Sequence, residues 1–254
     1  MKKIILAILI LAFCVSISGA GITDKLRAVI AAKNAGGGGA GQTFSDAFAY
    51  SDGELESVSS GVWEKLVGND SSVASGLFGL VVDAIYIYAT PVDTISQYAA
   101  VQLNPVSVAA YNGLYLRHVD KDAADTKAYA LRSNQSDSMS LRYCTGTSCT
   151  DIPASTISQV LGENDSIGIE VTGTDDATQW KVWWWDNVAP PARESWGTCK
   201  FGFYVSGQTA TSCTTNTSVT DLGANYADTG KYAGLYSGGG GTQLFDEFRF
   251  GDIP

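Results

Sequence analysis

Short runs of alternating apolar and polar residues, separated by Gly, Ser, Thr and Asn, recur along most of the chain. Thr43–Tyr50, for example, places Phe44, Phe48 and two other residues on one parity. Because alternation sends successive side chains to opposite faces, each run predicts a β-strand. The other predicted strands are Trp63–Val67, Phe78–Ile87, Tyr98–Leu103, Asn112–Arg117, Lys127–Arg132, Ser138–Tyr143, Ser166–Thr172, Trp180–Trp185, Lys200–Ser206, Lys231–Tyr236 and Leu244–Gly251. About a dozen short strands without a three-turn helix between them favour a two-sheet antiparallel sandwich over β–α–β units.

The first twenty residues predict a secretory signal peptide. Two lysines at positions 2 and 3 precede the apolar run 4–15, and the small residues Ser18 and Ala20 suit cleavage after residue 20. The apolar run is shorter than the ~20 residues of a membrane-spanning helix, so an uncleaved anchor is the less favoured alternative. We therefore expect residues 1–20 to be a signal peptide and the protein to be secreted or held at a cell surface.

Residues 21–42 predict a short helix followed by a flexible linker. Apolar residues lie three to four positions apart in Ile22–Asn34, and a glycine-rich tract at 35–41 follows. A helix with a single apolar stripe cannot bury that stripe by itself. It is therefore either a flexible leader or a segment for docking or self-assembly. The predicted sandwich domain then occupies residues 43–254.

The net charge of the chain narrows the classes of molecule that we expect it to bind. The 254 residues carry 16 Lys and Arg against 26 Asp and Glu, a formal net charge of −10. An acidic surface repels phosphates, which argues against a nucleic-acid partner. His118 is the one histidine in the sequence, so a multi-histidine metal centre is excluded and we expect a structural or surface role for this residue.

The cysteines indicate disulfide bonds. Cys14 lies in the predicted signal peptide, and an even number in an exported chain favours disulfides among the remaining four, which allow three pairings. Cys144 and Cys149 flank a tight glycine-containing turn, while Cys199 and Cys213 flank a predicted strand and turn. Local pairing, Cys144–Cys149 and Cys199–Cys213, is the prediction.

The tryptophan-rich segment 180–187 offers a candidate ligand surface. Alternation directs Trp183 and Trp185 away from the expected core face, about 7 Å apart along the strand. Sugars stack their apolar faces on such rings, and the adjacent acid and amide can bond hydroxyl groups. Alternatively, the segment Ala189–Trp196 folds over both rings and buries them, or the rings form a protein interface. The predicted carbohydrate-binding residues are Trp183, Trp185, Asp186 and Asn187.

The two ends of the predicted domain resemble a known family. The segments that carry the resemblance are Phe44–Phe48, Asp52–Leu55, Gly61–Trp63, Leu114–Arg117, Asn164–Val171, Lys231–Gly240 and Phe245–Asp252. Together they are similar to concanavalin A-like lectin and glucanase domains, the laminin G-like jelly rolls. The resemblance implies an all-β, two-sheet jelly-roll sandwich in which the first and last strands pair. Phe44, Phe48, Phe248 and Phe250 would then share one core layer.

The same resemblance implies a structural calcium ion where the first and last strands meet. Asp46 and Asp246 lie on these strands and share parity with the core phenylalanines. Two acids on the core side are costly unless a cation, a proton or hydrogen bonds neutralise them. Hydrogen bonding to loop backbone is the alternative to calcium.

The family includes both lectins and glycoside hydrolases, so the fold alone cannot assign a function. Hydrolases of this fold resemble one another in a Glu-x-Asp-x-(x)-Glu strand motif that supplies two catalytic carboxylates, and this sequence lacks it. We therefore expect no enzyme, although a degenerate hydrolase remains a third alternative. The predicted function is a secreted, non-catalytic carbohydrate-binding or adhesive module for a glycan or polysaccharide. The alternative is a structural or assembly protein of a cell surface or virion, docked through residues 22–34.

Overall fold

The computed structural model describes residues 41–80, 84–104, 110–120, 122–123, 127–134, 138–146, 148–239 and 243–253. The predicted signal peptide, the helix at 22–34 and most of the glycine tract lie outside these residues, so those expectations remain predictions. Within the described part of the chain, no helix is long and apolar enough to cross a membrane.

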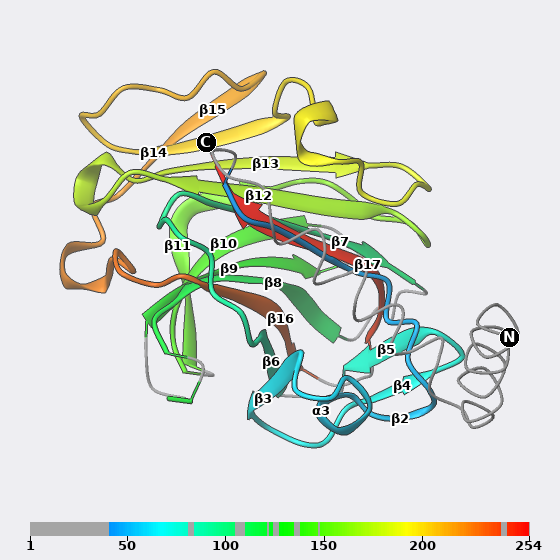
Figure 1. Cartoon of the computed structure of the whole chain (residues 1–254). Coiled ribbons are helices and arrows are strands. Elements are labelled where there is room, and N and C mark those ends of the chain that lie inside the picture. The colour runs from blue at the N-terminus through cyan, green and yellow to red at the C-terminus, as the bar shows by residue number, and fades with distance from the viewer. Residues whose placement is uncertain are drawn as a thin grey trace, which may run out of the picture. The chain divides into compact units, whose positions relative to one another are not determined.

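Two β-sheets pack face to face, as Figure 1 shows. One sheet has the order β15-β14-β13-β12-β7-β17-β5-β4-β2, with β1 also paired to β17, and the other has the order β11-β10-β9-β8-β16-β6-β3. The strands are β1 (Thr43–Asp46), β2 (Gly53–Glu54), β3 (Trp63–Val67), β4 (Ser72–Ala74), β5 (Leu77–Leu80), β6 (Ala84–Tyr88), β7 (Gln97–Leu103), β8 (Ala110–His118), β9 (Lys127–Asn134), β10 (Ser138–Thr145), β11 (Ser148–Ile157), β12 (Ser166–Thr172), β13 (Gln179–Trp185), β14 (Phe201–Val205), β15 (Thr215–Val219), β16 (Tyr232–Gly239) and β17 (Gln243–Asp252). The described helices are α3 (Leu55–Val58) and the 3₁₀ turns η1 (Asp175–Ala177), η2 (Arg193–Ser195) and η3 (Gly223–Asn225). The expected all-β sandwich of two packed sheets is confirmed.

The first and last strands pair, as the resemblance predicted. β1 runs antiparallel to β17 with Phe44 opposite Phe250, and their ring centroids lie 4.9 Å apart. Phe48 and Phe248 are fully buried in the same cluster and both contact the ring of Trp63. Burial of each large apolar side chain stabilises the fold by about 1.5–3 kcal/mol, so this aromatic layer ties the domain's two ends together.

The structure corrects several predicted strand boundaries. β1 ends at Asp46 rather than Tyr50, because Phe48 adopts a positive φ of 47° that breaks the extended backbone. The predicted strand Phe78–Ile87 is two strands, β5 and β6, which belong to different sheets. The short β2 and β4, and also β11 and β15, were not predicted. β15 departs from the antiparallel expectation, since it pairs with β14 in parallel.

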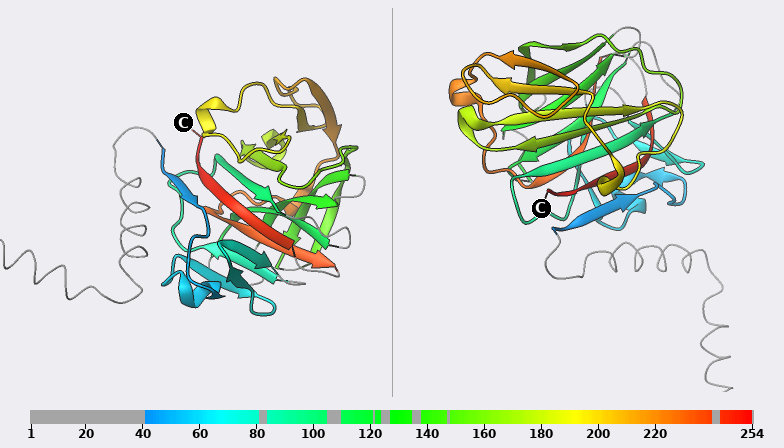
Figure 2. Two further views of the ribbon diagram at one scale, coloured as in Figure 1. Left: turned by 90° about the vertical axis from the view of Figure 1, so that its right-hand side faces the viewer. Right: turned by 90° about the horizontal axis from the view of Figure 1, so that it is seen from above.

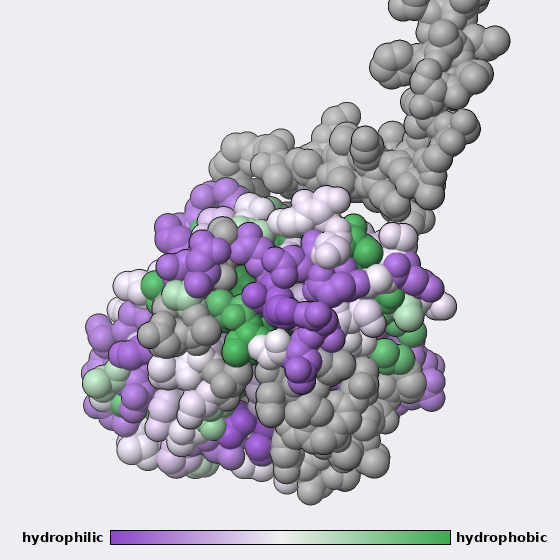
Figure 3. Space-filling model, turned by 90° about the horizontal axis from the view of Figure 1, so that it is seen from below, coloured by the Kyte–Doolittle hydropathy of each residue, from purple (hydrophilic) through white to green (hydrophobic). Residues whose placement is uncertain are grey.

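A second apolar cluster lies on the outer face of the seven-stranded sheet. Tyr115 alternates with core residues on β8, so its side chain points away from the sandwich interior, yet it is fully buried. Its hydroxyl donates to the carbonyl of Gly146, in the hairpin closed by the predicted disulfide Cys144–Cys149, which is present. Figure 3 shows the molecule from below, where a small apolar area near the middle of the view is surrounded mainly by hydrophilic residues. The hairpin is therefore linked to this cluster through Tyr115.

Candidate functional site

A strap, defined as residues 186–199, crosses the outer face of the ten-stranded sheet. It leaves the end of β13 and returns to the start of β14, and in Figure 2 (right) it is the yellow segment that runs across the strands. Its beginning is held by Asp165, whose carboxylate accepts a 2.7 Å hydrogen bond from the backbone N–H of Asn187. Its end is held by the predicted disulfide Cys199–Cys213, which is also present, with 4.7 Å between the two Cα atoms.

Trp196 fixes the middle of the strap to the sheet. Its ring makes edge-to-face contacts with Tyr98, Trp183 and Trp185, at centroid separations of 5.3, 5.0 and 5.1 Å. Its indole N–H donates to the carbonyl of Pro191 at 2.9 Å, and the residue is only 4% exposed. Edge-to-face pairs of this geometry contribute about 0.5–1.5 kcal/mol each beyond area burial. The strap is therefore a packed part of the domain.

A glycine in the sheet makes room for this packing. Gly168 lies in the middle of β12, opposite Trp183 on β13. A Cβ atom at this position would lie 2.8 Å from the ring of Trp185 and 3.0 Å from that of Trp196. A larger side chain here would therefore displace both rings, which explains a glycine inside a central strand.

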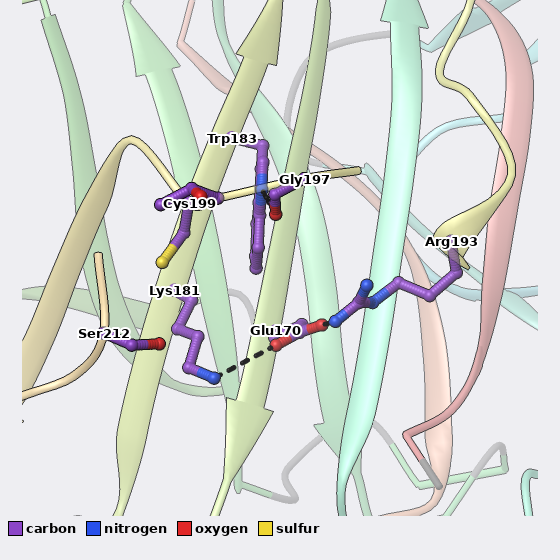
Figure 4. A pocket seen from close by; sticks show the side chains of 8 residues that line it. Glu170, Lys181, Trp183, Arg193, Gly197, Cys199 and Ser212 are labelled. Carbon is purple, nitrogen blue, oxygen red and sulfur yellow. Dashed lines mark hydrogen bonds and ion pairs between the residues drawn. The ribbon is translucent and has the colours of Figure 1, made fainter. Parts of the chain in front are cut away.

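Beside the strap lies a groove of about 450 Å³. It opens over β12 and β13, between the strap and the segment that precedes β15 (Figure 4). The groove is defined by its lining residues, which are Glu170, Lys181, Trp183, Arg193, Gly197, Thr198, Cys199 and Ser212. Among the described residues this is the hollow in which aromatic, charged and hydroxyl side chains gather, and it is the candidate functional site.

Three charged side chains form the floor of the groove. Glu170 is 1% exposed and lies between Arg193, which pairs with its Oε1, and Lys181, whose Nζ is 3.7 Å from its Oε2 (Figure 4). Strand register explains the contact with Lys181, because Glu170 and Lys181 are direct partners across β12 and β13. A buried carboxylate is costly without a cation, and Glu170 has one on each side.

Arg193 joins this charged floor to the aromatic strap. Its guanidinium carbon lies 5.5 Å from the ring centroid of Trp183 and 5.0 Å from that of Trp196. Burial lowers the pKa of Arg193, and nearby Tyr98 and Glu194 oppose that shift. Arginine remains protonated after such a shift, so the group supplies a fixed positive charge at the groove wall.

Only one of the four predicted carbohydrate-binding residues lines the groove. Trp183 is part of the wall but is 3% exposed, and its indole N–H donates to the carbonyl of Gly197 at 3.2 Å. Trp185 is half-buried against Trp196 outside the lining, while Asp186 and Asn187 are exposed in the turn after β13. The expectation of two open indole rings is therefore wrong for Trp183. The strap covers Trp183, whereas Trp185 is only half-buried beneath it.

The two acids expected to bind calcium do not form a metal site. Asp46 accepts hydrogen bonds from the backbone N–H of Phe48 at 2.7 Å, from the indole of Trp63 at 2.8 Å and from the hydroxyl of Tyr50. Asp246 is half-buried and accepts from the backbone N–H of Glu247 at 2.8 Å. No group of three or more His, Cys, Asp or Glu side chains in the described part of the chain is placed to hold a metal ion. Protein donors already occupy Asp46, so these residues do not fit calcium.

Burial raises the pKa of Asp46 above its ordinary value of 3.8, and the bonds from Tyr50, Trp63 and Phe48 partly oppose this shift. Burial likewise raises the pKa of Asp246. His118 has the structural role expected of it, since it is fully buried and its Nε2 lies 3.1 Å from the carbonyl oxygen of Ala123.

Several groove residues were missed from the sequence. Glu170 and Lys181 sit at outward positions of two predicted strands, so alternation could have identified their common face. Their pairing depends on strand register, which alternation alone does not fix. The remaining polar residues have no periodic signal, because they lie in the short turn η2 (Arg193) or outside helices and strands (Thr198 and Ser212).

Comparisons with known proteins show similarities in structure alone. No family model matches this chain, and a search of curated proteins found no significant match. Solved structures with similar chain paths include the carbohydrate-binding module CBM66 from Bacillus subtilis, at 10% identity and TM-score 0.42, covering 73% of this chain and 92% of that one. The VIP36 exoplasmic/lumenal domain, in a Ca²⁺/Man3GlcNAc-bound form, matches at 11% identity and TM-score 0.45, covering 77% and 85% of the two chains. A prokaryotic β-1,3-1,4-glucanase (lichenase) derived from a mouse hindgut metagenome matches at 11% identity and TM-score 0.41, covering 83% and 98%. At these values the similarity carries no information about ligand or activity.

Proposed function

We propose that this domain is an extracytoplasmic, non-catalytic carbohydrate-binding module, and that a glycan or polysaccharide binds in the groove beside the strap. The observation that carries the proposal is the composition of the groove lining. Acceptors, donors and hydroxyl groups surround a space of about 450 Å³ with one aromatic wall. Small-molecule sites combine an apolar wall and a few convergent polar groups in this way.

Sugars match this lining chemically. Each sugar hydroxyl both donates and accepts a hydrogen bond, and it therefore needs partners of both kinds. Lys181 and Arg193 are donors, and the exposed hydroxyls of Thr198 and Ser212 can both donate and accept. Trp183 lines the groove and supplies its apolar wall, against which the C–H groups of a sugar ring can pack.

The groove does not favour hydrolysis. Glycoside hydrolysis by the common mechanisms uses two carboxyl groups on opposite sides of the scissile bond, about 5–5.5 Å or 6.5–9.5 Å apart. Among the described residues that line the groove, Glu170 is the single carboxylate. Glu170 is 1% exposed and both of its oxygens face a cation, so this carboxylate is not open to a scissile bond.

The disulfides support a location outside the cytoplasm. Both the Cys144–Cys149 and Cys199–Cys213 bonds join residues of this chain, and such bonds persist mainly in oxidising compartments. The predicted signal peptide at residues 1–20 agrees with this location. Cys199 itself lines the groove, so an oxidising compartment also preserves the shape of the site.

The test is retention of the full chain on an array of polysaccharides and oligosaccharides. Ser212 is exposed at the groove, so Ser212→Trp should fill the space without disturbing the core. The matched control is Ser218→Trp, at an exposed position of β15 outside the lining. We expect the native chain and Ser218→Trp to bind the same glycan and Ser212→Trp to lose it. Equal binding by all three would place the site elsewhere, and no binding by the native chain would refute the proposed function.

A further inference from the structure

The groove has an excess of positive charge on an acidic protein. Two cations, Lys181 and Arg193, face one anion, Glu170, so the lining carries one net positive charge. The whole chain carries a formal net charge of −10. Glu194 follows Arg193 but is exposed and does not line the groove. This local reversal of sign is a feature that the binding of a neutral sugar does not require.

The two cations are engaged to different extents. Arg193 is paired with Glu170 and stacked against the rings of Trp183 and Trp196, so its guanidinium is held in place. Lys181 reaches Glu170 only at 3.7 Å, beyond hydrogen-bond distance, and its ammonium makes no hydrogen bond with the described residues. An ammonium group has three N–H donors, so Lys181 retains donors for a ligand. Lys181 is therefore the charged group that a ligand in the groove would meet.

An oxyanion on a sugar is the chemistry that satisfies this arrangement. The single net positive charge of the lining suits a ligand group with one negative charge, such as a carboxylate on a sugar ring. A phosphate carries about −1.5 to −2 at pH 7 and would exceed the charge of the site. The neighbouring hydroxyls of Thr198 and Ser212 then remain for the hydroxyl groups of the same ring.

We infer that the groove selects acidic glycans, and specifically glycans with uronic acid units, through a charge-assisted hydrogen bond from Lys181 to the sugar carboxylate. This inference rests on the proposed function, because it specifies the class of glycan that the same groove takes. Charge-assisted hydrogen bonds are shorter and stronger than neutral ones, so the carboxylate adds affinity that a neutral sugar lacks.

The test compares each acidic ligand with its own methyl ester, which keeps the ring and its hydroxyls and removes the charge. The probes are oligomers of galacturonic, glucuronic and mannuronic acid and their esters, titrated calorimetrically into the full chain. We expect at least one acid to bind at least about tenfold more tightly than its ester, and this preference to shrink as salt is added. Lys181→Gln should abolish the preference, so that each acid and its own ester bind this variant with affinities within about twofold of each other. Lys200→Gln, which removes an exposed cation outside the lining, should preserve the preference.

The outcomes separate this inference from the proposed function. If the native chain binds a neutral glycan, Ser212→Trp blocks that binding and no acid exceeds its ester, selection of acidic glycans is wrong and glycan binding in the groove stands. If an acid is preferred but Lys181→Gln keeps the preference, the assignment to Lys181 is overturned. If neither acids nor neutral glycans bind, both proposals fall.

Discussion

Replacing Trp196 by alanine should release the strap from the sheet. The indole contacts Tyr98, Trp183 and Trp185 at centroid distances of 5.0–5.3 Å and is 4% exposed. Burial of an aromatic side chain removes roughly 150–250 Å² from water, which at about 25 cal/mol per Å² stabilises the fold by about 4–6 kcal/mol as an upper estimate. Measured Trp-to-Ala changes in cores cost about 3–5 kcal/mol, and we expect a loss in this range.

Urea unfolding followed by far-ultraviolet circular dichroism measures this loss for the whole domain. Acrylamide quenching of the remaining tryptophans measures the local change, since Trp183 is 3% exposed in the intact protein and should become accessible. The control is Val188→Ala, in the same strap at a side chain that is 50% exposed, for which we expect a change below about 0.5 kcal/mol. A loss below about 1 kcal/mol for Trp196→Ala, with unchanged quenching, would refute the role assigned to this residue.

Three other predictions concern the Cys199–Cys213 disulfide, the buried Asp46 and the binding of calcium. Replacing both Cys199 and Cys213 with serine should lower the free energy of unfolding by about 3 kcal/mol, the value for a loop of about 15 residues, and urea denaturation of the double variant measures it. Because burial raises the pKa of Asp46, the folded state holds its proton more tightly than the unfolded state, so stability from this group falls as pH rises from 3.8 through the raised pKa. The native chain should therefore lose stability relative to Asp46→Asn over that range in urea midpoints, and parallel midpoints would contradict the shift. Because Asp46 is occupied by protein donors, the melting temperature should be unchanged by excess EDTA or by added calcium, and a rise with calcium would mean that an ion binds.

The sequence predicted the sandwich because the patterns that specify it lie within short segments of the chain. Alternation along β12 and β13 decides which side chains enter the core, and the aromatic residues at both ends of the domain form the layer that pairing of β1 and β17 requires. Both disulfides were predicted, because each pair of cysteines flanks a turn that brings the two residues together along the chain. Patterns of this kind depend only on residues that are close together in the sequence. They can therefore be read before the fold is known.

The candidate site could be predicted only in part, because it depends on contacts between distant segments. Alternation placed Trp183 on the outer face, but its burial depends on Trp196, which is held there by ring contacts with two strands. The ion pairs of Glu170 with Lys181 and Arg193 depend on strand register and on the path of the strap. The residues between β13 and β14 have no periodic pattern, so their path could not be derived from propensity.

The most direct test of glycan binding in the groove is the nuclear magnetic resonance signal of the Trp183 indole N–H. This group donates to the carbonyl of Gly197, a groove-lining residue, and substitution of single tryptophans by phenylalanine assigns its signal. Titration of the full chain with a glycan retained on the array should shift the Trp183 signal. The signal of Trp63, which is bonded to Asp46 in the core, should stay in place. Saturable binding that leaves the Trp183 signal unmoved would contradict the assignment of the groove as the binding site.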